Sequence, residues 1–303
     1  MTQATAAARA ATIPEISGIH ELAGRYEAIL CDVWGVLIDG KKHFPQAADA
    51  LIRFRGQGGK VVLVTNASRP DAEVRRQLLG LGLPEAAFDD LVSAGELTLN
   101  EMVARKGQAC YHLGPPRDNG LFDEAGRRLG ATLRKASPEE ADYVVCTGLF
   151  DERAEIPQDY DERLAALKAR DLVMICANPD IVVAIGDDIV YCAGAIAERY
   201  AAMGGKVLMF GKPHPPIYAA ARERLARLAG RPVPDRRIVA IGDGALTDLA
   251  GAGRAGLDCV FVTDGVHGEE LRPAGGDIDP AALERLVEIA GARPVALARA
   301  VFW

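Results

Sequence analysis

The chain has 303 residues, 49% of them hydrophobic and 25% charged, which is ordinary globular composition and enough length for two domains. Its formal net charge of −7 argues against a protein that binds nucleic acid electrostatically, and gives no reason to expect attraction to an anionic membrane. No apolar run reaches the roughly 18 residues that span a bilayer, so we expect no membrane association.

The N-terminus and the cysteines favour a cytoplasmic protein. Residues 1–11 are rich in alanine and lack the basic segment and compact apolar core of a secretion signal, so we expect a loosely packed leader. The six cysteines are scattered and form no C-x-x-C pair. We therefore expect reduced, buried thiols rather than a zinc site or a disulfide framework.

The first third of the chain alternates strand-like and helix-like segments. Residues 28–31 predict a buried strand that ends at Asp32, and Gly35 then marks a bend where the backbone must approach something closely. The apolar run that ends at Thr65 and Asn66 is typical of a parallel strand buried on both faces. The pattern also predicts helices over 44–56, from about 70 and over 96–105, and strands over 60–66 and 91–95.

A second unit with the same alternation begins near residue 106. Its strand-like segments are 110–114, 143–148 and 172–177, and its helix-like segments are 123–129 and 160–170. After it, residues 206–211 predict a strand that leads to Lys212, and residues 237–242 predict a strand that ends at Asp243. A helix over 217–228 and a strand over 259–263 complete the pattern.

Polar side chains thus follow four apolar strands, at Asp32, Thr65-Asn66, Lys212 and Asp243. A doubly wound parallel sheet would gather these strand ends at one edge, where ligands bind in open α/β sheets. We therefore predict an α/β protein with a Rossmann-like core of residues 1–103 and 206–303. Residues 104–205 would form an inserted α/β cap over that edge, like a lid.

The motifs, in this order, resemble the haloacid dehalogenase (HAD) superfamily, and more closely its class IIA branch related to nitrophenyl phosphatases. In that branch an α/β cap is inserted between the second and third motifs. The matching motifs are Asp32–Leu37, Val64–Asn66, Gly211–Pro213 and Gly242–Asp248, together with Asn178–Asp180 in the insert.

The resemblance implies a hydrolase whose nucleophile is Asp32, which would form an aspartyl-phosphate. Mg²⁺ would be held by Asp32, the backbone carbonyl of Trp34, Asp243 and Asp248, with oxygen ligands that suit this hard cation. Lys212 would neutralise charge between the phosphate and the nucleophile, because two anions cannot approach each other without a cation.

The resemblance also implies where the substrate binds. The substrate would be a small phosphorylated metabolite, and class IIA proteins often form homodimers through the cap. Thr65 and the amide of Asn66 would hold a phosphoryl oxygen, and the cap would contact the leaving group. The expected substrate-binding residues are Thr65, Asn66, Gly35, Asn178 and Asp180.

Trp34 departs from the family pattern, because the family's phosphatases carry a second aspartate there. That aspartate protonates the leaving group and then activates water, which typically contributes 10²–10⁴-fold to the rate. Three explanations stay open. The chain could be a phosphatase that uses good leaving groups or borrows an acid such as Asp39, His43 or a cap residue. It could be a dehalogenase-like carbon–heteroatom hydrolase, which the acidic fourth motif argues against, or a near-inactive protein that binds a phosphorylated ligand.

Overall fold

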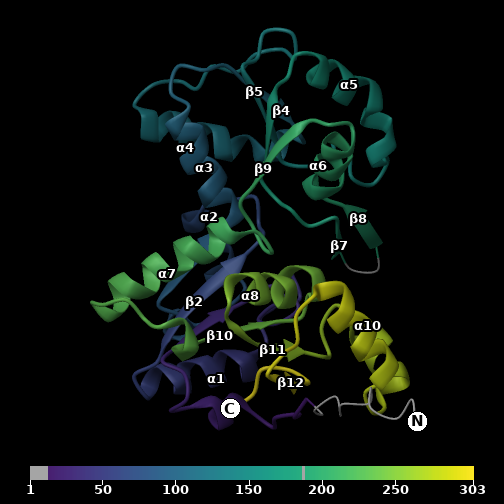
Figure 1. Ribbon diagram of the computed structural model, residues 1–303. Coiled ribbons are helices and arrows are strands. Elements are labelled where there is room, and N and C mark those ends of the chain that lie inside the picture. The colour runs from purple at the N-terminus through teal and green to yellow at the C-terminus, as the bar shows by residue number, and fades with distance from the viewer. Residues whose placement is uncertain (1–12, 186–187) are drawn as a thin grey trace, which may run out of the picture.

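The computed structural model describes residues 13–185 and 188–303, which form two lobes, one above the other in Figure 1. The leader expected over residues 1–11 lies outside the described residues. The lower lobe, here the core lobe, is built on a six-stranded parallel sheet of order β12-β11-β10-β1-β2-β3. Its strands are β1 (Ala28–Cys31), β2 (Lys60–Thr65), β3 (Asp90–Ser93), β10 (Ile238–Gly242), β11 (Asp258–Val262) and β12 (Ala296–Ala298).

The chain winds outward from the centre of this sheet in both directions. From β1 it proceeds through β2 to β3 on one side, and β10, β11 and β12 follow in order on the other. The strand order therefore switches between β1 and β10, which pair in parallel with Ala28 opposite Ile238 and Cys31 opposite Ile241. This arrangement confirms the predicted doubly wound sheet and marks the β1–β10 boundary as the place for a ligand.

Helices cover both faces of the core sheet, which explains its continuous apolar strands. Alternate residues of β1 face opposite sides: Ile29 and Cys31 pack in one hydrophobic cluster, and Ala28 and Leu30 in the other. The helices of the first cluster are α1 (Pro45–Gly56) and α2 (Asp71–Gly80), and those of the second are α7 (Pro215–Ala229), α8 (Ala250–Ala255) and α10 (Pro280–Ala290). A short helix, α9 (Gly268–Leu271), follows β11.

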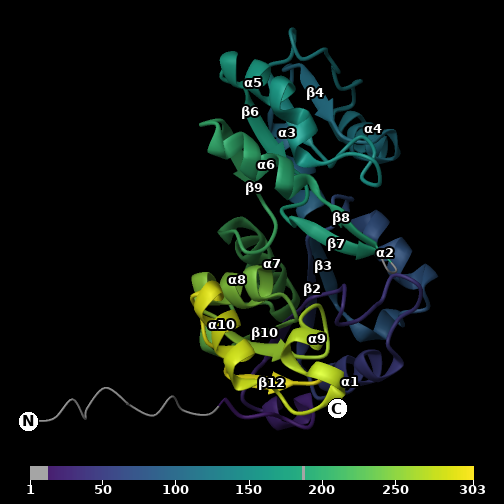
Figure 2. The same cartoon turned by 90° about the vertical axis from the view of Figure 1, so that its right-hand side faces the viewer.

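The upper lobe, here the insert lobe, has its own four-stranded parallel sheet of order β4-β5-β6-β9. An antiparallel hairpin, β7–β8, extends from it toward the core lobe in Figure 2. The strands are β4 (Cys110–Leu113), β5 (Tyr143–Cys146), β6 (Val173–Cys176), β7 (Val182–Ile185), β8 (Asp188–Tyr191) and β9 (Lys206–Met209). The helices are α3 (Ala94–Ala104), which enters the lobe, α4 (Asn119–Leu129), α5 (Asp161–Ala169) and α6 (Ala193–Ala202).

The strand before Lys212 lies in the insert lobe, so its predicted place in the core sheet is wrong. β9 pairs in parallel with β6, with Lys206 opposite Val173 and Met209 opposite Cys176. The error has a physical reason, because an apolar run followed by a turn shows that a strand ends without showing which strand it pairs with. We propose that the insert lobe runs to about residue 210 rather than 205.

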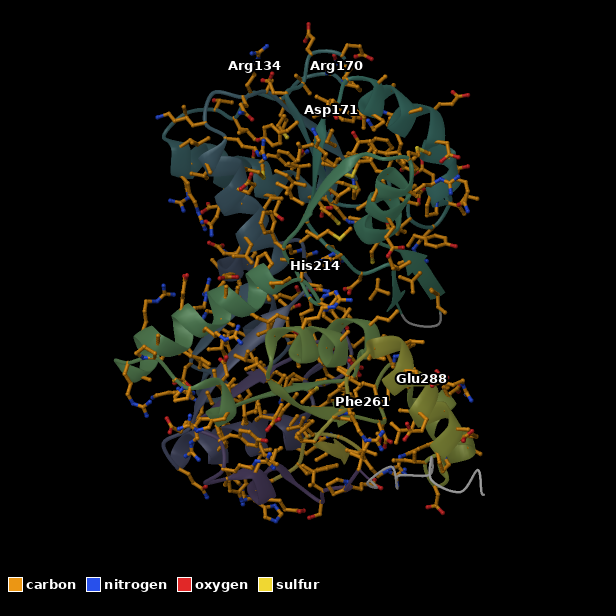
Figure 3. All side chains as sticks on the ribbon, viewed as in Figure 1. Arg134, Arg170, Asp171, His214, Phe261 and Glu288 are labelled. Atoms are coloured by element: carbon orange, nitrogen blue, oxygen red, sulfur yellow. The ribbon has the colours of Figure 1, made fainter. Side chains whose placement is uncertain are left out.

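The carboxyl ends of the two parallel sheets face each other across the junction between the lobes. Lys212, which follows β9, bonds to Asp32, which follows β1, and Asn66, which follows β2, bonds to Asp180, which lies just beyond β6. Figure 3 labels His214, the residue before α7, at this level between the lobes. The strand-end groups of both sheets therefore share one site.

Two further expectations concern the whole chain. All six cysteines are buried and free of disulfides, as the sequence predicts. Among the described residues, no helix has both the length and the apolar character needed to cross a bilayer.

Candidate active site

Three carboxylates meet at the switch point of the core sheet. Asp32 follows β1 and Asp243 follows the neighbouring β10, while Asp248 lies in a π-helical turn, Ala245–Leu249, just beyond. One carboxylate oxygen from each residue lies within 4.8 Å of those from the other two, and all three side chains are buried. Such a group of buried like charges is costly unless cations compensate it.

Lys212 supplies one of those cations. Its Nζ donates to Asp32 Oδ1 and also to Asp248 Oδ1, at 2.8 Å for the second contact. The Lys212 side chain is itself buried, so water screens neither ion pair effectively. One ammonium therefore joins the residue expected to be the nucleophile to a residue expected to bind metal.

Burial and mutual repulsion disturb the ionisation of this group. Burial, and then the charge of Asp248, raise the pKa of Asp32 well above its usual value, although Lys212 opposes the shift. Burial, and then Asp248, raise the pKa of Asp243 to about 6. Burial disfavours the charged form of Lys212, but the charges of Asp248 and Asp32 outweigh it and hold the pKa of Lys212 well above its usual value. Lys212 therefore compensates the negative charge of the three carboxylates only in part.

Main-chain amides orient two of the carboxylates. Val266 N donates to Asp243 Oδ2 at 2.8 Å, and Gly244 N donates to Asp248 Oδ2 at 3.1 Å. The loop that carries Val266 follows β11 and was not among the predicted site residues. The available signal was Gly265, three residues after the end of the buried strand β11. A Cβ at Gly265 would come within 2.2 Å of Asp243 Oδ2.

The bend predicted at Gly35 lies against the acid cluster. Gly35 has φ of +77°, and a Cβ there would lie 2.1 Å from Asp243 Oδ2, so only glycine fits. The close approach brings the backbone of Trp34 and Gly35 to the edge where the carboxylates meet. The Trp34 side chain is 36% exposed and rests on Gly40 in the same hairpin.

Asn66 connects the two lobes through its side chain. Its Oδ1 accepts from Lys212 N at 2.7 Å, and its Nδ2 donates to Lys212 O at 3.0 Å and to Asp180 Oδ1 at 2.8 Å. The neighbouring Thr65 is buried at the end of β2, and its Oγ1 accepts from Ala67 N at 3.3 Å. The sequence placed Asn66 in the site, and its side chain holds the lysine loop and the insert lobe in position.

The structure brings Asp180 into the junction, while the Asn178 side chain supports the loop that presents it. Asn178 Oδ1 accepts from Asp180 N at 3.0 Å. Pro179 packs on Gly211, where a Cβ would come within 2.6 Å of Pro179 Cγ. Burial raises the pKa of the Asp180 carboxyl, and the hydrogen bond from Asn66 partly opposes the shift. Asn178 to Asp180 thus form a tight turn that docks on the core lobe.

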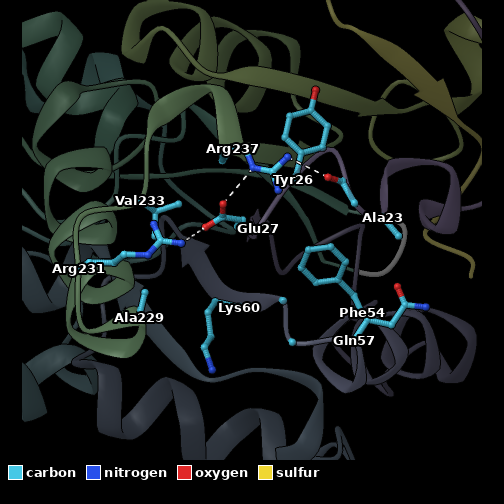
Figure 4. A pocket seen from close by; sticks show the side chains of 13 residues that line it. Ala23, Tyr26, Glu27, Phe54, Gln57, Lys60, Ala229, Arg231, Val233 and Arg237 are labelled. Carbon is cyan, nitrogen blue, oxygen red and sulfur yellow. Dashed lines mark hydrogen bonds and ion pairs between the residues drawn. The ribbon is translucent and has the colours of Figure 1, made fainter.

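A hollow elsewhere on the core lobe does not belong to this site. It has a volume of about 420 Å³ and lies at the amino ends of the strands, beside Lys60 at the start of β2. Figure 4 shows Glu27 between Arg231 and Arg237, and its carboxylate accepts from both guanidinium groups. The acid cluster lies at the opposite, carboxyl edge of the same sheet.

The residues at the acid cluster fit a divalent cation. The three carboxylates offer hard oxygen ligands from one small region, and Lys212 leaves their charge only partly compensated. The amides of Val266 and Gly244 orient two of the carboxylates, as hydrogen bonds to ligating groups do in metal sites. Carboxylate ligands of this kind suit a hard divalent cation rather than a thiophilic metal.

Comparison with known proteins agrees with this arrangement. Residues 29–128 match the model of haloacid dehalogenase-like hydrolases, and residues 209–287 match a HAD-hydrolase-like model. A hydrolase of the haloacid dehalogenase-like family from Brucella suis is 40% identical, with a TM-score of 0.80 over 95% of this chain and 99% of that one.

Two relatives with named activities are more distant. The ribonucleotide monophosphatase NagD of Escherichia coli K12 is 25% identical over 78% of this chain and 88% of its own. The p-nitrophenyl phosphatase of Archaeoglobus fulgidus is 22% identical and shares the fold, with a TM-score of 0.67 over 91% of this chain and 96% of that one.

The doubly wound core and the inserted α/β lobe are those of a hydrolase, with a buried acid cluster at the carboxyl edge of its central sheet. The chain belongs to the haloacid dehalogenase-like hydrolase family, in its class IIA branch. The resemblance drawn from the motifs is therefore confirmed, and the protein is an enzyme whose named relatives here are phosphatases.

Proposed function

We propose that the protein is a Mg²⁺-dependent phosphatase that acts on a small phosphorylated metabolite through an aspartyl-phosphate at Asp32. The observation that carries the proposal is the position of Lys212, whose Nζ bonds to both Asp32 and Asp248 inside a buried acid cluster. A phosphoryl group cannot approach a carboxylate without positive charge nearby. Lys212 supplies part of that charge, and a cation held by the three carboxylates would supply the rest.

Each residue of the cluster has a distinct part in this proposal. Asp32 is the nucleophile. Its carboxylate lies at the end of β1, at the edge where the parallel strands all present their carboxyl ends to the incoming phosphate. Asp32, Asp243, Asp248 and the Trp34 carbonyl hold Mg²⁺, which when bound supplies positive charge to the phosphate oxygens. Lys212 opposes the upward shift in the pKa of Asp32 and contributes the remaining positive charge.

The phosphate is held by the end of β2. Thr65, its hydroxyl buried at the edge of the sheet, and the main-chain amide of Asn66 are the proposed donors to its oxygens. Gly35, whose own amide donates to Ile38 O at 3.0 Å, is proposed to line the same space. Asp180 and the loop that begins at Asn178 enclose the same space from the insert lobe, on the side where the leaving group departs. We also propose, as the sequence predicts, a cytoplasmic protein that can form a homodimer.

Trp34 supports a second candidate function, the binding of a phosphorylated ligand without efficient turnover. Its indole cannot donate a proton to an alkoxide as a carboxylic acid does, and its exposure at the site gives a binding surface instead. A near-inactive protein that binds a phosphorylated ligand would keep Lys212 and the acid cluster for affinity alone. A dehalogenase-like reaction has less support, because it has no use for a cluster suited to Mg²⁺.

The decisive experiment measures release of nitrophenolate from nitrophenyl phosphate by the full-length protein with Mg²⁺. We expect turnover that disappears in Asp32→Asn, which keeps the shape of the side chain and removes the nucleophile. Equal turnover in that variant would overturn the assignment of Asp32. Binding of phosphate esters with Mg²⁺, but no turnover in the unmodified protein, would favour the second candidate.

A further inference from the structure

Trp34 places an apolar surface at the position where the family resemblance implies a carboxyl group. A Cβ on Gly40 would come within 2.6 Å of Cζ3 and 2.7 Å of Cη2 of the indole, so the benzo edge of Trp34 rests on that residue. The side chain remains 36% exposed. The backbone that carries it also approaches Asp243, because the next residue, Gly35, has no room for a side chain there.

The titratable side chains of the same hairpin do not replace the missing acid. The Asp39 carboxylate accepts from Lys41 N at 2.8 Å and Lys42 N at 2.9 Å, and these bonds lower its pKa and keep it ionised. His43 Nδ1 lies 3.1 Å from the carbonyl oxygen of Leu81, just after α2. Both side chains that the sequence suggested as substitutes are therefore engaged with other parts of the core lobe.

Asp180 is an insert-lobe carboxyl at the junction, and it too has a partner. Its Oδ1 accepts from Asn66 Nδ2, and the turn that carries it packs on the loop before Lys212. Through this bond Asp180 holds the two lobes together. A proton-transfer role for Asp180 predicts different kinetics, which the experiment below separates from a purely structural role.

The carboxyl group that is absent at position 34 matters in both halves of the proposed reaction. In the first half, an Asp32 oxygen bonds to phosphorus, the bond from phosphorus to the leaving oxygen breaks, and its electron pair leaves on that oxygen. A phenolate, whose conjugate acid has a pKa of about 10, leaves unprotonated far more easily than an alkoxide, with a value of about 15. The absence of an acid therefore selects against alkyl esters.

In the second half, water bonds to phosphorus and the bond to Asp32 breaks, which restores the carboxylate. The water must lose a proton as it attacks, and the side chain that accepts it in related phosphatases is absent. The proton must pass to a phosphate oxygen or to solvent. Hydrolysis of the aspartyl-phosphate is thereby slowed by the same substitution that restricts its formation, by a factor on the order of 10²–10⁴.

Resting on the proposed function, we propose that Trp34 selects phosphate esters of aromatic hydroxyl groups and leaves the enzyme with a long-lived aspartyl-phosphate. The exposed face of the indole offers a stacking surface to a planar leaving group, which such an ester carries. The two effects agree, since an aromatic leaving group is also the kind that departs without a proton.

The test is a rapid-mixing measurement with Mg²⁺ and 4-nitrophenyl phosphate. We expect a burst of about one nitrophenolate per chain, followed by slow turnover, and at least 10²-fold slower turnover of glycerol phosphate. Trp34→Asp should abolish the burst and raise turnover of glycerol phosphate by about 10²-fold or more. Trp34→Phe should retain the burst, and Trp303→Phe, which changes the other tryptophan, is the matched control.

Three outcomes would contradict the proposal in distinguishable ways. Rapid turnover of both esters without a burst, still lost in Asp32→Asn, overturns the role of Trp34 and leaves the phosphatase intact. Selective loss of glycerol phosphate turnover in Asp180→Asn identifies Asp180 as the acid and likewise overturns the proposal. Turnover that survives in Asp32→Asn overturns the proposed function itself.

Discussion

The side chains of Asn66 and Asp180 join the core lobe to the insert lobe through one hydrogen bond of 2.8 Å, from Nδ2 to Oδ1. The same amide also bonds both main-chain polar groups of Lys212. The position of the Lys212 backbone and a contact between the two lobes therefore depend on one residue. Since Asn66 is buried, an unpaired partner there costs about 1–3 kcal/mol.

This relationship predicts that Asn66 and Asp180 are energetically coupled. Asn66→Ala and Asp180→Ala should each lower the free energy of unfolding in urea, and the double variant should lose less than the sum by about 0.5 kcal/mol or more. Asp180→Asn keeps an oxygen that can accept the bond and should be the mildest change. Strict additivity in the cycle would show that the bond contributes nothing to stability.

Lys212 should stabilise the fold strongly in the absence of Mg²⁺. Lys212→Met leaves buried carboxylates without a partner, which typically costs about 3–5 kcal/mol, and added Mg²⁺ should recover part of it. The measurement is urea unfolding with EDTA and then with Mg²⁺. Lys206→Met is the control, because Lys206 forms an exposed ion pair with Asp171 and should contribute less than about 1 kcal/mol. Similar losses in both variants would be inconsistent with a buried charge network.

Gly35→Ala should abolish metal binding, an effect that backbone strain alone does not explain. The new Cβ would collide with Asp243 Oδ2, so we expect the Mg²⁺-dependent rise in melting temperature and the turnover of nitrophenyl phosphate to disappear. Gly58→Ala is a matched control: its φ of +92° carries a similar strain of about 1–2 kcal/mol, but nothing lies within 4 Å of the added Cβ. If both variants keep the Mg²⁺ response, Gly35 does not shape the site.

His112 should make the insert lobe sensitive to acid. Burial, with a smaller contribution from Lys135, lowers the pKa of His112 to about 4, and its Nε2 lies 2.9 Å from Thr147 Oγ1. The unfolded chain binds this proton below about pH 6.5, so unfolding takes up a proton between pH 6.5 and 4, and stability falls as the pH falls through that window.

Replacing His112 should remove part of that pH dependence. Between pH 7 and pH 4.5 the free energy of unfolding of His112→Gln should fall by about 1–2 kcal/mol less than that of the parent protein. This amount is reduced for the partial exposure of the ring. His20→Gln, at an exposed position, is the control for replacing a histidine by glutamine. The prediction is wrong if the His112→Gln curve also follows the parent curve.

Much of the core lobe and its acid cluster could be predicted because the signals are local. A buried parallel strand leaves a continuous apolar run, and Asp32, Thr65 and Asp243 directly follow or end such runs. Parallel strands bring those ends to one edge whatever their separation in sequence. The metal-ligand role proposed for Asp248 needed the family resemblance, since an acid in a turn has no such signature by itself.

The remaining features depend on contacts that sequence patterns do not encode. The partner of β9 is decided by packing against β6, and the run of residues 206–209 reads the same in either sheet. The amide of Val266 orients Asp243 through the main chain, which leaves no side-chain signal. The bond from Asn66 to Asp180 spans residues 114 positions apart and forms only when the lobes meet.

The place of β9 in the insert sheet limits how this enzyme can be recombined. Lys212 emerges directly from the last strand of the insert sheet, so a chimera that exchanges the insert at residue 205 would separate that strand from the sheet it completes. A graft joined after residue 210 would carry its own final strand and could still deliver the lysine to Asp32. The insert, proposed to contact the leaving group, and the lysine proposed to support phosphate transfer would therefore have to be exchanged together.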